Sequence, residues 1–80
     1  MTKSEAIAEI EQVAGAAFTV QDIDDLASAN DQQLRKILQG WLDIQTVRDS
    51  SALSAIGTIL SKVAEWAPLA LKIAGVAALL

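Results

Sequence analysis

The acidic side chains are the first candidates for chemistry in this 80-residue chain. Three aspartates stand close together at Asp22, Asp24 and Asp25. A hard cation needs about six or more oxygen ligands, and the glycine and glutamate of an EF-hand loop are missing at the required offsets. Carboxylates near the start of a helix are instead favoured by the helix dipole. We therefore predict capping and solvated aspartates here, and no metal site.

The residue types that most catalytic sites use are largely absent. The chain has no Cys and no His, which excludes thiol nucleophiles, disulfides, zinc fingers and imidazole bases. Glu5 and Glu9 share one face of a predicted helix, with Glu11 nearby, but no nucleophile or base accompanies them. We predict a protein that is not an enzyme and that uses no cofactor.

Arg35, Lys36 and Trp41 are the residues that could contact a nucleic acid. Affinity for phosphate depends on clustered Lys and Arg, whereas this chain has a net charge of −4. We predict that these residues belong to an amphipathic helix and that the chain binds neither nucleic acid nor a small-molecule substrate.

The elements that position these residues are predicted to be helices throughout. No segment alternates with a period of two, β-branched residues do not cluster, and alanine is frequent. Capping-box patterns stand at Thr2 with Glu5, at Thr19 with Asp22, and at Asn30 with Gln33. We predict an all-α protein of four to five helices, with a helix over 20–29, a longer one from 30 to about 47, and a break over 48–51.

Charge is distributed unevenly along the chain. Residues 1–50 carry five more acidic than basic side chains, whereas residues 51–80 carry one more basic than acidic side chain. Of the last 29 residues, 20 are apolar. We therefore divide the chain into an acidic amphipathic helical head, 1–50, and an apolar C-terminal helix, 51–80, that contacts an assembly or a membrane.

The apolar residues of the C-terminal segment follow a heptad spacing that runs through Pro68. The residues at these positions are large up to Val63 and are alanines from Ala67 onward. Because proline cannot continue the hydrogen bonding of a helix interior, we predict a long, Pro-kinked helix or a break into two helices at Ala67.

We predict that this segment binds a protein partner or a second copy. The predicted contact residues combine the heptad positions with a second apolar stripe: Leu53, Ile56, Leu60, Val63, Trp66, Ala67, Leu69, Ala70, Ile73, Ala74, Val76, Ala77 and Leu80.

Three functions fit these patterns. The first is a structural subunit of a multi-copy assembly, for example a virion or a secretion-type complex. The second is a membrane-active or membrane-anchored protein of the holin or toxin kind, with Trp66 at the membrane interface. Against this, residues 67–80 form only about 21 Å of helix against a hydrocarbon core of about 30 Å, and Lys72 interrupts them. The third is a regulator whose C-terminal helix docks into a groove of one partner.

The N-terminal residues lack the basic segment and apolar run of a secretory signal. We therefore expect an assembly component that is made in the cytoplasm, with membrane association as the alternative.

Overall fold

All described residues of the computed structural model, 1–80, belong to helices or to the short turns that join them. The α-helices are α1 (Lys3–Ala14), α2 (Val20–Ser28), α3 (Asp31–Asp43), α4 (Ser50–Leu60) and α5 (Ala67–Ala77). A 3₁₀ turn, η1 (Ala64–Trp66), leads directly into α5. The predicted all-α class is confirmed.

Side-chain caps begin the first four helices. In α1 the Thr2 hydroxyl accepts a hydrogen bond from the Glu5 amide at 3.2 Å, and the Glu5 carboxylate accepts one from the Thr2 amide at 3.0 Å. The same reciprocal pair forms at the predicted capping boxes of α2 and α3. Asp49 caps α4 by accepting from the Ala52 amide at 2.9 Å. These bonds satisfy backbone donors that a helix N-terminus leaves without partners.

The end of α3 differs from the sequence prediction. The helix stops at Asp43 instead of continuing to about Val47, and Gln45 adopts a left-handed turn with φ of 58°. Ile44 follows Leu38 and Trp41 at three-residue spacing, which in a continuous helix predicts an inward position. Beyond the end of the helix this period no longer sets side-chain direction, and Ile44 is 76% exposed. Val47 closes the turn, since it is fully buried and its amide donates to the Trp41 carbonyl at 3.2 Å.

The C-terminal segment forms two helices and not one long kinked helix. The chain leaves α4 after Leu60, several residues before Pro68, and η1 then turns it back toward α5. Pro68 lies in the first turn of α5, where its missing N–H has no intrahelical partner to lose. Pro68 therefore helps to begin the second helix, and the two apolar faces can bury each other within one chain.

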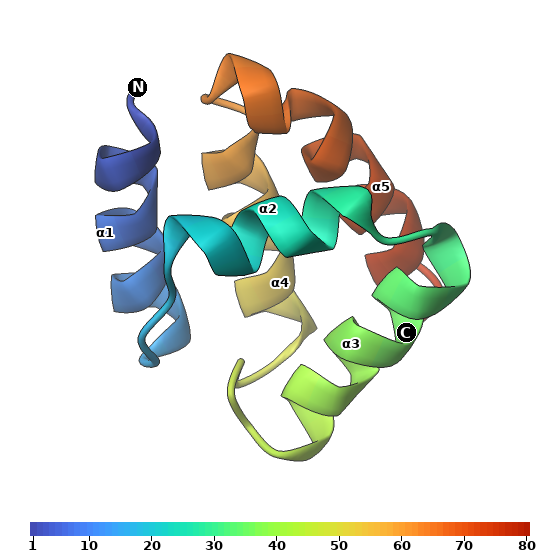
Figure 1. Cartoon of the computed structure of the whole chain (residues 1–80). Coiled ribbons are helices and arrows are strands. Elements are labelled where there is room, and N and C mark those ends of the chain that lie inside the picture. The colour runs from blue at the N-terminus through green and yellow to red at the C-terminus, as the bar shows by residue number, and fades with distance from the viewer.

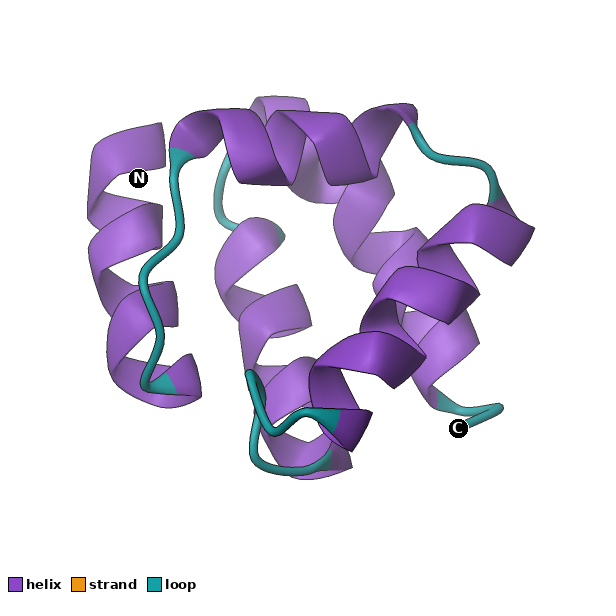
Figure 2. Cartoon of the chain, turned by 60° about the horizontal axis from the view of Figure 1, so that its bottom comes forward, coloured by secondary structure: helices purple, strands orange, loops and turns teal.

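The helices are arranged around α4. Helix α4 lies between α1 and α5, and it packs most extensively on α5, which runs back alongside it (Figure 1). Helix α2 crosses over these helices and contacts α1 and α5, while α3 packs against α5 (Figure 2). The molecule measures 28 × 24 × 19 Å along its principal axes.

One hydrophobic core joins both halves of the chain. Nine of its buried residues precede position 51 and eleven follow it, and no polar or charged residue is buried with them. The apolar sides of α4 and α5 therefore cover α1, α2 and α3, and much of the C-terminal apolar surface is used inside this chain. The core residues are Ala6, Ile7, Ile10, Phe18, Ile23, Leu26, Leu34, Leu38, Val47, Ala52, Leu53, Ile56, Ile59, Leu60, Val63, Trp66, Leu69, Ala70, Ile73 and Val76.

Candidate functional site: a groove between α4 and α5

A cluster of polar contacts around Trp66 fixes where α5 begins. The Trp66 indole N–H donates to the Asp24 carboxylate of α2 at 2.8 Å, and the side chain is 1% exposed. Lys3 of α1 pairs with Glu65 at 2.8 Å and with Asp24 at 3.5 Å. The Lys3 ammonium also lies 5.3 Å from the centroid of the Trp66 ring, within the range of a cation–π contact. The cluster ties η1 to α1 and α2.

These contacts shift the ionisation of two of the side chains. The hydrogen bond from Trp66, together with the nearby Lys3 charge, lowers the pKa of Asp24 below its ordinary value. The hydrogen bond to Glu65 and the charges of Asp24 and Glu65 raise the pKa of Lys3. Both charged forms are therefore favoured in the folded protein.

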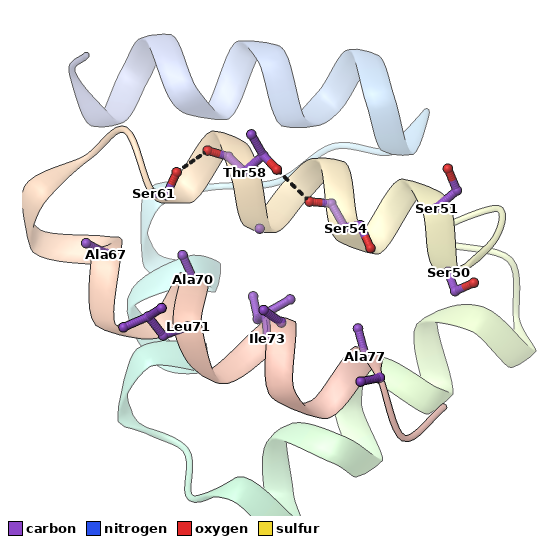
Figure 3. A pocket seen from close by; sticks show the side chains of 13 residues that line it. Ser50, Ser51, Ser54, Thr58, Ser61, Ala67, Ala70, Leu71, Ile73 and Ala77 are labelled. Carbon is purple, nitrogen blue, oxygen red and sulfur yellow. Dashed lines mark hydrogen bonds between the residues drawn. The ribbon is translucent and has the colours of Figure 1, made fainter.

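A groove of about 770 Å³ lies on the outer side of the α4–α5 pair. Serine and threonine side chains of α4 form one wall and alanines of α5 form the other (Figure 3). No charged residue lines it, and Leu71 on its α5 side is 77% exposed. The lining residues are Ser50, Ser51, Ser54, Gly57, Thr58, Ser61, Ala67, Ala70, Leu71, Ile73, Ala74, Ala77 and Ala78.

The hydroxyl groups in the second half of α4 are bound to their own helix. Thr58 donates to the Ser54 carbonyl at 3.1 Å, and Ser61 donates to the Thr58 carbonyl at 2.6 Å (Figure 3). A serine nucleophile needs an adjacent base, and no titratable side chain lines the groove. The chemistry that the groove can offer is therefore contact with an apolar or weakly polar surface.

Gly57 lies at the floor of the groove, where α4 and α5 approach each other. A Cβ atom at this position would lie 3.6 Å from Ile73 Cγ2 and 3.9 Å from the Ala70 carbonyl oxygen, both ordinary van der Waals distances. The depth of the groove therefore comes from small side chains along both helices and does not depend on Gly57 alone.

Most of the residues predicted to bind a partner lie in the core of this chain. The buried ones are Leu53, Ile56, Leu60, Val63, Trp66, Leu69, Ala70, Ile73 and Val76. Ala67, Ala74 and Ala77 line the groove, as do the edges of Ala70 and Ile73, and Leu80 is half-buried beside the core. The small-residue half of the heptad pattern thus faces the groove, while its large-residue half faces inward.

The α4 wall of the groove and Leu71 were not among the contact residues predicted from the sequence. A signal for the wall is present, because Ser50, Ser54 and Thr58 recur every four residues opposite the apolar face of α4. Leu71 gave no such signal, since its spacing fits a helix that is apolar on nearly every side.

The other residues that the sequence offered as candidates for chemistry have structural roles in the fold. Asp22 caps α2, and Asp25 accepts a hydrogen bond from Gln21 at 2.8 Å. No group of three or more acidic side chains lies close enough together to hold a metal ion. Trp41 is half-buried and packs edge-on against Phe18.

None of the helices combines the length and the apolar character that crossing a membrane requires.

Comparison with models of known protein families, with curated proteins and with solved structures finds no match to this chain.

Proposed function

We propose that this chain is a non-enzymatic structural subunit that self-associates through the groove between α4 and α5 and so builds a multi-copy assembly. The observation that carries the proposal is an exposed groove without charge, lined by small side chains, beside an exposed leucine. An apolar concavity of this kind at a protein surface is typical of an interaction site.

The small side chains favour a helix as the occupant. Alanine and serine allow two helices to approach closely, and ordering them at an interface costs little side-chain entropy. Ala67, Ala70, Ala74 and Ala77 repeat every three or four residues along α5, so they form a continuous strip against which a helix of another molecule can pack.

The charge distribution favours a second copy. The acidic excess lies in residues 1–50, whereas the segment that forms α4, η1 and α5 has one more basic than acidic side chain. Two copies that meet through their α4–α5 faces keep most of their acidic side chains away from the contact. The face also holds both a groove and a protruding Leu71, so the groove of one copy can receive Leu71 of another copy.

Sedimentation velocity across a concentration series tests this proposal. We expect the wild-type chain to form a concentration-dependent dimer or larger species. Ala74→Glu should abolish it, because each groove would then bury an unpaired carboxylate. Ala8→Glu is the matched control, since Ala8 is an exposed alanine of α1 outside the groove, and it should associate like the wild type.

A wild-type chain that remains monomeric at millimolar concentration contradicts the proposal, as does equal association of Ala74→Glu and wild type. A monomer that floats with lipid vesicles, with flotation lost in Ala74→Glu, would assign the groove to a membrane surface instead.

A further inference from the structure

A second cavity lies between α2 and α3, and its lining differs in chemistry from that of the α4–α5 groove. It has a volume of about 350 Å³, which suits one side chain or a small organic group. Its lining combines aliphatic and aromatic residues with two carboxylates: Ala17, Phe18, Asp22, Asp25, Leu26, Ile37 and Trp41.

The aromatic part of this cavity is built by Phe18 and Trp41. Their ring centroids are 5.2 Å apart and their planes are inclined at 62°, an edge-to-face arrangement. Phe18 is buried in the core, so it holds Trp41 in place, whereas Trp41 is only half-buried. Because the face of an indole carries negative electrostatic potential, an exposed part of such a face attracts cations.

The carboxylates have acceptor capacity left for a ligand. Asp22 uses one oxygen to accept from the Thr19 amide at 2.8 Å, and Asp25 uses one to accept from Gln21 at 2.8 Å. Neither carboxylate forms an ion pair, since both ion pairs of the chain belong to Lys3. A negatively charged and partly aromatic cavity therefore has no cation of its own.

Lys36 is a basic side chain that lies beside this cavity. It lines an adjoining hollow that shares Asp25 and Ile37 with the cavity, but it does not line the cavity itself. Lys36 is exposed and makes no ion pair, so it leaves Asp25 available to a ligand.

We infer that the cavity between α2 and α3 binds an arginine side chain of a partner protein. A guanidinium group is planar, so it can stack on an indole, and it donates several hydrogen bonds in a fork that matches carboxylates. The net charge of −4 also draws a basic partner toward the chain. This interaction goes beyond the proposed self-association and uses none of the residues that line the α4–α5 groove.

The experiment is an NMR titration of the full chain with N-acetyl-arginine amide, a capped arginine with a single positive charge. We expect saturable shifts of the Trp41 indole N–H and of the Asp22 and Asp25 amides. The indole N–H of Trp66 should stay unchanged, since it is buried and donates to Asp24. The uncharged analogue N-acetyl-citrulline amide, which has nearly the same shape, should produce no saturable shift.

Two asparagine variants, each of which removes one negative charge, separate the local effect of a carboxylate from the effect of net charge. Asp25→Asn should weaken binding by about threefold, as expected for one exposed ion pair. Asp43→Asn is the matched control, because Asp43 is also exposed and also accepts from a glutamine four residues earlier, at 2.9 Å. It lies outside the cavity lining and should bind like the wild type. Ile37→Lys places a cation at the cavity and should abolish binding.

Equal shifts with capped citrulline, equal weakening by the two asparagine variants, or no saturable shift at Trp41 would overturn the inference. Ala74→Glu should bind capped arginine normally, so that failure of this site and failure of self-association give different results.

Discussion

Asp24 connects three helical elements through one carboxylate. It lies in α2, accepts the indole N–H of Trp66 from η1 at 2.8 Å, and pairs with Lys3 of α1 at 3.5 Å. Trp66 is the largest fully buried side chain of the chain, and its N–H has no other acceptor. The charge on Asp24 therefore contributes to the stability of the docked η1 turn.

Acid should weaken this contact in a defined direction. Because the pKa of Asp24 is lower in the folded protein, its contribution to stability is present above the ordinary aspartate pKa and is lost as the pH falls through the lowered value. We expect the urea midpoint of the wild type to drop in this acidic range. The urea midpoint of Asp24→Asn should drop less over the same range, because this variant has no carboxylate to protonate at position 24. Asp25→Asn, which leaves the Trp66 contact intact, should follow the wild type.

The raised pKa of Lys3 acts at the opposite end of the pH scale. Its contribution to stability is present below the ordinary lysine pKa and is lost as the pH rises through the raised value.

The Asp24 prediction has a clear contradicting outcome. If the urea midpoints of Asp24→Asn and the wild type fall equally in acid, the Asp24 charge does not hold the η1 turn.

The role of Trp66 was outside the reach of sequence patterns. Its place between a charged and an apolar segment fitted an interface, and 42 positions separate it from Asp24. Local spacing carries no information about such a pair, because only the path of the chain between them brings the two side chains together.

At the scale of single helices, two glycines should respond in opposite ways to alanine. Gly40 lies inside α3, where a Cβ atom would meet nothing within 4 Å, so Gly40→Ala should stabilise the protein by about 0.5–1 kcal/mol. Gly15 ends α1 with φ of 73°, so Gly15→Ala should destabilise it by about 1 kcal/mol. Urea denaturation followed by circular dichroism measures both, and equal signs for the two changes would contradict the argument.

The contribution of a helix cap to the free energy of unfolding should also be measurable. Thr19→Ala removes the hydroxyl that accepts from the Asp22 amide at 3.1 Å and should lower the free energy of unfolding by about 1 kcal/mol. Thr46→Ala is the control, since Thr46 lies in the turn after α3 and caps no helix. Unfolding curves that coincide for the two variants would show that the α2 cap adds nothing.

Helix starts were predictable, whereas the ends of α3 and α4 were not. A capping box involves residues only three positions apart, so Thr2, Thr19 and Asn30 could be assigned from spacing alone. The early end of α3 depends on the burial of Val47, which is a tertiary contact. Pro68 allowed a break into two helices at Ala67 to be predicted as one alternative, and α5 begins there, whereas the end of α4 at Leu60 depends on the tertiary packing of α5 against α4.

At the scale of the whole molecule, the shared core makes the two halves of the chain interdependent. A fragment of residues 1–50 keeps only nine of the core residues and exposes them, so we expect it to show weak helical circular dichroism and no cooperative urea transition. The full chain is the control. A cooperative transition in the fragment would show that the acidic head folds by itself.

The fold class could be predicted from the sequence, but what the apolar residues of the C-terminal segment pack against could not. Composition and spacing indicated that the terminal helix is apolar on nearly every side, and such a helix packs against either its own chain or another one. In the structure Leu53, Leu60 and Ile73 pack inside this chain, and a narrower strip that includes Ala74 is left for the groove. Periodicity shows that a face must be covered, whereas only the tertiary arrangement shows what covers it.

The packing of α1 on α4 also determines when the chain can fold during its synthesis. Domains generally begin to fold as their residues leave the ribosome. In this chain α1 has its main packing surface on α4, and Lys3 pairs with Glu65. The main packing partners of the N-terminal helix therefore lie in the second half of the chain, so α1 cannot complete its packing before α4 and η1 have been synthesised.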